Sequence, residues 1–182
     1  GPLTIISSNV SQNRSQGSGA GIRHTGGDLT LTDVLVASNV AGIAGGGLAT
    51  SGGTVEVAIT TFRANRSVDQ GGAVAVGEDA NVNALRSDFE DNQSGFGGAF
   101  GTQGGLLSVR ESSLTGNTAT DGGAVRQSGG RVILESTTLA ENSATGFGGA
   151  VYGSDGALVF VYNSTLYDNE ARRGGGLASS GA

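Results

Sequence analysis

Acidic side chains are the residues of this sequence best suited to chemistry. Glu141 and Asp168 each stand one position before a recurring Asn, so in a repeating fold they would occupy equivalent places in successive units. Two carboxylates about 5 Å apart suit a retaining glycosidase, and their oxygens suit Ca²⁺. We favour the alternative of a solvated acidic face, since no Gly-Gly-x-Gly-x-Asp calcium-binding nonapeptide occurs. We therefore expect no cofactor, and Glu141 and Asp168 are the candidate ligands if Ca²⁺ binds.

Catalysis on acidic polysaccharides is a second chemistry to consider. A lyase would need acidic ligands for Ca²⁺ and a general base, and without Lys that base would be Arg. Arg110 or Arg131 could lie near Glu111 or Glu135, but no local motif supports an active site there. The repeat also leaves no long inserted loop to hold one. We therefore expect no catalytic residues and no enzyme, and we expect the single His, His24, at the surface.

The composition excludes several classes of function. The 182 residues include 10 Arg and 16 acidic residues, for a net charge of −6, so no basic stripe is available for nucleic acid. Gly and polar residues interrupt every apolar run, and we expect no direct membrane insertion of this segment. With no Cys, disulfides, thiolate metal sites and Cys nucleophiles are excluded.

A Gly-rich tetrapeptide ending in an apolar residue occurs seven times, at intervals of 25 or 26 residues. A glycine pair supplies positive φ or a close backbone approach, which predicts a corner at each copy. The predicted corner glycines are Gly45, Gly46, Gly71, Gly72, Gly97, Gly98, Gly122, Gly123, Gly148, Gly149, Gly174 and Gly175.

An apolar-x-x-Asn motif precedes each tetrapeptide. An Asn that recurs once per unit at a bend can stack on its neighbours, its amide donating to the next unit and satisfying backbone groups of the turn. The predicted ladder consists of Asn13, Asn39, Asn65, Asn92, Asn117, Asn142 and Asn169. We interpret these motif residues as structural, and we expect binding instead at the exposed, variable positions between each Asn and the following Gly, and after each tetrapeptide.

Two further apolar residues, spaced two apart, precede each apolar-x-x-Asn motif, as in Leu29 and Leu31. This alternation indicates a strand with one buried face. Each unit thus holds about three short strands, and a single unit cannot bury its apolar side chains alone, whereas stacked units can. The sequence predicts an all-β, right-handed parallel β-helix of about seven coils of 25–27 residues.

The domain prediction follows from the reach of the repeat. We interpret residues 1–2, Gly-Pro, as a scar of protein expression, and residues 3–182 as a single β-helix domain cut from a longer repeat array.

The paired motifs resemble a known family. Phe62-x-x-Asn65 followed by Gly71-Gly72-Ala73-Val74, and Phe89-x-x-Asn92 followed by Gly97-Gly98-Ala99, are similar to the repeats of the chlamydial polymorphic outer membrane proteins. The resemblance covers residues 3–177. It implies a right-handed β-helix passenger of an exported, often autotransported, surface protein, and in the chlamydial members it implies adhesion to host cells.

We therefore expect a secreted or cell-surface segment of an adhesin or autotransporter-like passenger. Its expected partner is a protein or glycan of a host or neighbouring cell, and its open ends predict end-to-end self-association. The alternative is a structural stalk with no ligand of its own. A polysaccharide lyase or hydrolase is the third, less favoured hypothesis.

Overall fold

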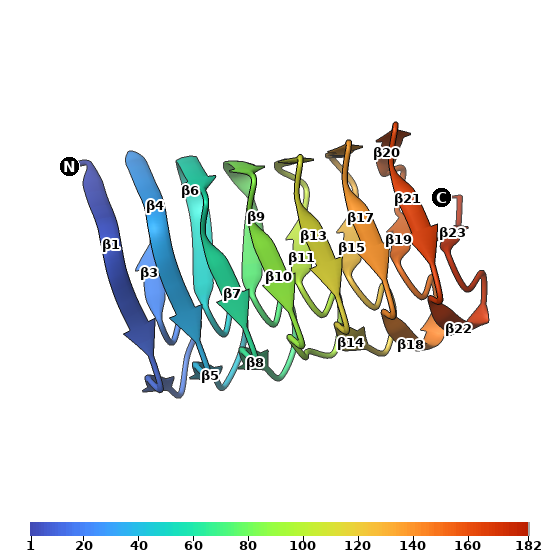
Figure 1. Ribbon diagram of the computed structural model, residues 1–182, viewed down its shortest axis with the longest axis horizontal. Coiled ribbons are helices and arrows are strands. Elements are labelled where there is room, and N and C mark those ends of the chain that lie inside the picture. Colours follow the sequence, from blue (N-terminus) through green and yellow to red (C-terminus); the bar gives the residue numbers. More distant parts are fainter. Residues whose placement is uncertain (182) are drawn as a thin grey trace.

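The chain forms seven stacked coils of β-structure (Figure 1). The computed structural model describes residues 1–181, so residue 182 of the predicted domain lies outside the described residues. The N- and C-termini lie at opposite ends of the stack, and the chain descends along the near face and returns along the far face as it advances (Figure 1). This sense is right-handed, and the predicted parallel β-helix is confirmed.

The sequence repeat sets the register of the coils, which we number 1 to 7 from Leu3. Leu3 pairs with Leu29, and Leu29 pairs with Val55, always in parallel strands. The same column continues through coils 4 to 6 and reaches Val159 in coil 7. Equivalent residues of successive repeats are therefore direct neighbours along the axis.

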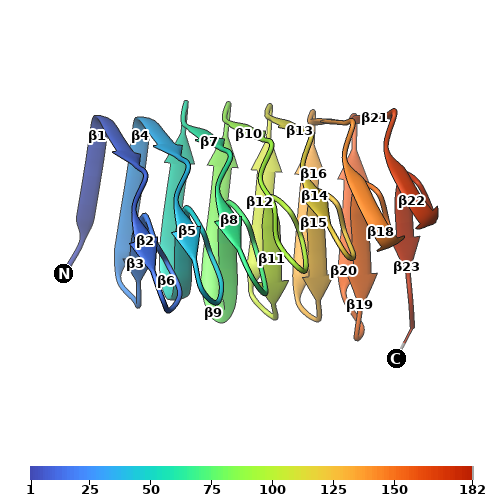
Figure 2. The same ribbon diagram turned by 90° about the horizontal axis from the view of Figure 1, so that it is seen from below.

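Four strand positions recur around the coil (Figure 2). The alternating apolar pair lies in β1 (Leu3–Ser11), β4 (Asp28–Ala37), β6 (Leu48–Ala58), β9 (Val74–Leu85), β12 (Leu106–Arg110), β16 (Arg131–Glu135) and β20 (Leu158–Tyr162). The apolar residue of the Asn motif lies near the ends of β1 and β4 and in β7 (Thr61–Arg63), β10 (Asp88–Glu90), β13 (Ser113–Thr115), β17 (Thr138–Ala140) and β21 (Thr165–Tyr167).

The other two positions flank the glycine corner. The residues after it lie in β3 (Ile22–His24), the starts of β6 and β9, β11 (Phe100–Gln103), β15 (Val125–Ser128), β19 (Val151–Ser154) and β23 (Leu177–Ser179). The fourth position was not predicted and comprises β2 (Arg14–Ser15), β5 (Val40–Ala41), β8 (Arg66–Ser67), β14 (Thr118–Ala119), β18 (Ser143–Phe147) and β22 (Glu170–Arg173). These short strands form two three-stranded sheets, whereas the other positions share one 17-stranded sheet.

Three corners of each coil carry a residue with positive φ. One is the first glycine of the Gly-rich tetrapeptide, with φ of 62° at Gly45. The second directly precedes each ladder Asn, and the third lies between the first two strand positions, as at Ser38 and Asp33 with φ of 56° and 55°. Left-handed backbone is uncommon for residues other than Gly. Its recurrence indicates that the stacked hydrogen bonds hold these corners in place.

The interior of the stack is apolar. Phe62, Phe89 and Phe100 are fully buried, and the rings of Phe62 and Phe89 stack with centroids 5.2 Å apart. Buried Leu and Val side chains such as Val36, Leu114 and Leu139 fill the equivalent columns in coils 2, 5 and 6, and the columns are only partly buried at the two end coils. Coil-on-coil packing therefore supplies the core that a single repeat lacks. The described residues contain no helix long and apolar enough to cross a membrane.

Candidate functional site

The Asn ladder runs through all seven coils, as predicted. Each Asn Nδ2 in coils 1 to 6 donates to Oδ1 of the Asn in the next coil, at 2.9–3.1 Å. The same Oδ1 accepts the backbone N–H of the preceding Asn, as Asn92 Oδ1 does from Asn65 at 3.0 Å. From coil 2 onward each Nδ2 also donates to a carbonyl of the preceding coil, such as Phe62 for Asn92 at 3.0 Å. The ladder residues of coils 2 to 6 are fully buried, and their amides are satisfied within the protein.

A second ladder, of hydroxyl groups, runs along another corner and was not predicted. Ser87 Oγ accepts the backbone N–H of Thr60 at 3.1 Å and donates to the carbonyl of Leu85 at 2.9 Å. The position is five residues before each ladder Asn, and only Val34 in coil 2 lacks a hydroxyl. The members are Ser8, Thr60, Ser87, Ser112, Thr137 and Ser164. The recurring Ser or Thr was the sequence signal for this ladder.

The glycine pairs have two different geometries. The first glycine of every pair has φ between 59° and 65°. The second lies flat against the next coil, and a Cβ on Gly46 would stand 2.5 Å from the carbonyl oxygens of both Arg66 and Gly72. A side chain there would collide with backbone that cannot move aside.

Glu141 and Asp168 occupy equivalent exposed positions in coils 6 and 7, directly before the ladder residues Asn142 and Asn169. Both have positive φ, at 56° and 52°. Within residues 1–181, no cluster of three or more His, Cys, Asp or Glu residues is arranged to hold a metal ion. Glu141 and Asp168 thus stand as a pair without a third such ligand.

Three of the four other ionisable residues considered for catalysis, Arg110, Glu111 and Glu135, form surface ion pairs. Arg110 Nε lies 3.1 Å from Glu135, and Glu111 lies 2.9 Å from Arg86 Nε. Arg131 instead lies over the ring of Phe160, 5.7 Å from its centroid. Exposed pairs of this kind contribute little to stability. Arg110, Glu111 and Glu135 are therefore paired with opposite charges on the exposed surface.

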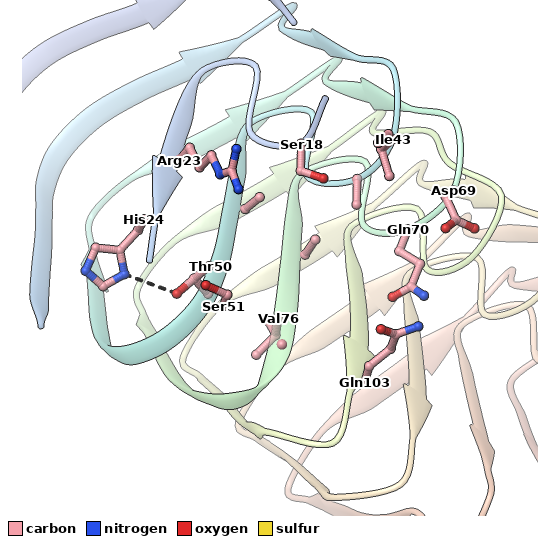
Figure 3. A pocket seen from close by; sticks show the side chains of 14 residues that line it. Ser18, Arg23, His24, Ile43, Thr50, Ser51, Asp69, Gln70, Val76 and Gln103 are labelled. Atoms are coloured by element: carbon pink, nitrogen blue, oxygen red, sulfur yellow. Dashed lines mark hydrogen bonds between the residues drawn. The ribbon is translucent and has the colours of Figure 1, made fainter. Parts of the chain in front are cut away.

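The prediction that His24 lies at the surface is wrong. His24 is 7% exposed, and its Nδ1 lies 3.1 Å from Thr50 Oγ1 in the next coil (Figure 3). The reason is strand alternation, because Ile22 and His24 share the inward face of β3, which pairs with Leu48 and Thr50. His24 Nε2 has no hydrogen-bond partner among the described residues.

A surface hollow of about 290 Å³ extends over coils 1 to 4, between the loops before the glycine corners and the strands after them (Figure 3). Its lining includes the methyl groups of Ala49 and Ala75 and the side chain of Ile43, which is 50% exposed. The polar residues of its rim are Ser18, Arg23, Ser51, Asp69, Gln70 and Gln103, and the buried His24 and Thr50 line it as well. These lie between Asn and Gly, or after the tetrapeptide, where binding was predicted.

The hollow results from small residues in two adjacent columns. One column, before the glycine corner, reads Ser18, Ala44, Gln70, Phe96, Asp121, Phe147 and Arg173. The other, after the corner, reads Arg23, Ala49, Ala75, Gly101, Arg126, Tyr152 and Ala178.

Large side chains fill the same space in the later coils. Arg126 lies over the ring of Phe96, 4.7 Å from its centroid. The rings of Phe147 and Tyr152 stack 5.3 Å apart. The surface is therefore open where the columns hold Ser, Ala and Gly, and it is closed from coil 5 onward.

The six polar side chains of the rim have no partners within the protein. None of them forms a hydrogen bond with another residue in the described part of the chain, whereas His24 and Thr50, which also line the hollow, bond to each other. Other exposed polar residues do pair, such as Asn83 with Glu56 at 2.8 Å. Arg23 contributes a positive charge and Asp69 a negative one, so the lining is close to neutral.

One carboxyl group outside the hollow has a shifted pKa. Asp155 Oδ2 accepts the hydroxyls of Ser128 at 2.7 Å and Ser154 at 2.9 Å. These hydrogen bonds lower the pKa of Asp155, and Arg126 lowers it further. Asp155 lies at a corner next to β19 and is a surface group.

Fold and ladders together define the chain as a parallel β-solenoid built on stacked side-chain ladders. The family model of the Chlamydia polymorphic membrane protein repeat matches residues 136–154, which hold one Asn motif and one Gly tetrapeptide of coil 6. The predicted relation to that repeat is thus confirmed there. No curated protein and no solved structure matches the chain.

Proposed function

We propose that this chain is a passenger segment of a bacterial cell-surface protein and that it takes part in binding. Three features support the proposal: the repeat match at residues 136–154, the β-solenoid fold and the surface hollow. The matched family is named for membrane proteins of Chlamydia, which supports a location at the cell surface or outside it. The proposal includes no catalytic step and no cofactor.

The hollow is the observation that carries the binding role. The solenoid satisfies its buried Asn amides internally, so polar groups without protein partners stand out. Six of them surround a floor of methyl groups within one concave surface. Convergent polar groups around an apolar floor are typical of ligand sites.

A structural stalk is the second candidate, and the unbroken Asn ladder favours it. Seven side chains connected from end to end stiffen the rod, which would hold another domain away from the cell. A stalk needs no ligand. Binding by this segment itself distinguishes the two functions.

The test is an array of glycans and extracellular-matrix proteins, probed with residues 1–182 at physiological salt, with Ca²⁺ and with a chelator. Saturable binding to an array component supports a recognition segment, and heat-unfolded protein serves as the control. A folded protein that binds no component would refute the recognition role and leave the stalk. Binding only with Ca²⁺ would refute the absence of a cofactor and direct attention to Glu141 and Asp168.

A further inference from the structure

We infer that the hollow over coils 1 to 4 is a binding site for a short neutral oligosaccharide. The inference rests on the proposed recognition function and names its ligand and its location. It follows from the shape of the hollow, from its hydrogen-bonding groups and from its charge.

The shape suits a chain of sugar rings laid along the axis of the rod. The small side chains of the two columns span about three coil spacings of ~4.8 Å, giving a length of about 14 Å. Arg23 lies at one end, and Gln70 and Gln103 lie at the other, where their side chains are close together (Figure 3). Beyond them, Phe96 and Arg126 close the surface. The hollow is therefore closed at this end, and the length of about 14 Å that it covers within residues 1–181 suits a short ligand.

The floor and rim offer the two kinds of contact that a sugar makes. The methyl groups of Ala49 and Ala75, which are 9% and 8% exposed, line an apolar floor against which the C–H face of a ring can lie. Gln70 and Gln103 each offer both donors and an acceptor, so that one amide can bind two neighbouring hydroxyls. Asp69 accepts hydroxyl protons and Arg23 donates to hydroxyl oxygens.

An extended peptide fits the site less well. Peptides commonly bind to a β-sheet by adding a strand at a free edge. The strands that form the floor in coils 2 to 4, in β6, β9 and β11, pair with a coil on each side, as Leu48 pairs with both Ile22 and Val74. The backbone of these coils has no free edge to offer, so recognition over them depends on side chains, and of the strands along the hollow only β3 in coil 1 has an unpaired edge among the described residues.

The charge of the lining favours a neutral ligand. Arg23 and Asp69 offset each other, and the chain carries a net charge of −6. An acidic polysaccharide would be repelled by the protein as a whole. Neutral hexoses and N-acetylhexosamines lack this penalty.

The test fills the hollow with a side chain that the fold already uses. Ala75→Tyr places at coil 3 the residue that Tyr152 supplies in the same column of coil 6. Ala178→Tyr is the matched control, since Ala178 pairs directly with Tyr152 and lies outside the hollow. Circular dichroism and thermal melts establish whether both variants are folded. A third variant, Gln103→Ala, removes a polar group of the rim and leaves the floor of the hollow unchanged.

The probes are neutral di- to tetrasaccharides of glucose, galactose, mannose and N-acetylglucosamine, with a uronate oligosaccharide for comparison, followed by saturation-transfer NMR and calorimetry. We expect at least one neutral saccharide to bind with millimolar or tighter Kd. Ala75→Tyr should weaken binding at least tenfold, Gln103→Ala severalfold, and Ala178→Tyr less than twofold.

Three outcomes would overturn the inference: no neutral saccharide binds, the uronate binds more tightly, or Ala75→Tyr binds as wild type does. If the array binds the protein and Ala75→Tyr leaves that binding intact, the recognition function stands and this site fails. If no component of the array and no neutral saccharide binds, both the recognition function and this binding site are refuted.

Discussion

Replacement of one interior ladder residue, Asn92→Ala, should destabilise the protein by several kcal/mol. The change removes Oδ1, which accepts the Asn65 backbone N–H at 3.0 Å and Asn65 Nδ2 at 3.1 Å. It also removes two donations, to the carbonyl of Phe62 and to Asn117 Oδ1, each at 3.0 Å. Asn65, Asn92 and Asn117 are fully buried, so water cannot replace the lost partners.

The magnitude follows from the groups left behind. A buried polar group without a partner costs about 1–3 kcal/mol. Asn65 N–H loses its acceptor, and three other groups each lose one of their bonds, for a total of about 3–4 kcal/mol. At about 2–4 °C per kcal/mol for a chain of this size, Tm should fall by roughly 6–16 °C.

Two variants serve as controls for this prediction. Asn13→Ala removes only the start of the ladder, where the exposed Asn13 donates to Asn39 without accepting from an earlier coil, and should cost below about 1 kcal/mol. Glu141→Ala changes an exposed residue that directly precedes the interior ladder residue Asn142. It should change the free energy of unfolding by no more than about 0.5 kcal/mol. Urea unfolding followed by circular dichroism measures all three. The reasoning is refuted if Asn92→Ala costs no more than either control.

Three further predictions concern the hydroxyl ladder, the glycine corners and Asp155. Ser87→Ala should lower the free energy of unfolding by about 1–3 kcal/mol, because the buried backbone N–H of Thr60 loses its acceptor. Ser87→Thr keeps the hydroxyl and should be nearly neutral. Equal urea midpoints for the two variants would contradict the hydroxyl ladder. Gly46→Ala should prevent stable folding, because its Cβ would meet two backbone oxygens. Gly17→Ala is the control and should melt like wild type, because the nearest atom to its Cβ is 3.8 Å away. Similar melting temperatures of the two variants would refute the close approach at Gly46. Ser154→Ala should raise the pKa of Asp155 toward its ordinary value in an NMR titration, and an unchanged pKa would show that this hydrogen bond does not matter.

The lowered pKa of Asp155 also fixes the sign of its contribution to stability. A carboxyl whose folded pKa lies below its unfolded value stabilises the fold above the unfolded pKa, and this contribution is lost as the pH falls through the folded pKa. The effect belongs to acidic pH only. Because Asp155 is a surface group, we expect the change to be small.

The fold could be predicted from the sequence because the repeat encodes it three times over. The Asn, the Gly pair and the alternating apolar residues each return once per coil, so each independently fixes the register that pairs Leu29 with Leu3 and Val55. A one-residue slip would turn the apolar pairs outward. The predicted and observed columns therefore coincide.

The features that were missed are the short or common ones. β2 and β5 contain two residues each, too few for any periodicity. The hydroxyl ladder consists of Ser and Thr, which are frequent throughout this chain. Their recurrence five residues before each Asn was recognised only when the coils were seen stacked. His24 was misplaced because it was considered alone, although its spacing of two from Ile22 places both on the inward face.

The hollow could only be recognised in three dimensions. It depends on residues before one glycine corner lying beside residues after the next, and Phe96 with Arg126, 30 positions apart, shows this contact. The sequence alone gives the residues of each column. It does not show that small members of the two columns lie together over coils 1 to 4.

The direction of the Asn ladder gives the rod a polarity. Between the Asn side chains, each Nδ2 from Asn13 to Asn142 donates toward the C-terminal coil, and each Oδ1 from Asn39 to Asn169 accepts from the N-terminal side. Two rods meeting at their N-terminal ends would place acceptor against acceptor, and two C-terminal ends would place donor against donor. Only head-to-tail contact continues the ladder, and repeated head-to-tail contact generates open filaments rather than closed dimers. Self-association through the ends would therefore not end at a dimer. In a longer array of these coils the ladder would point in the same direction throughout.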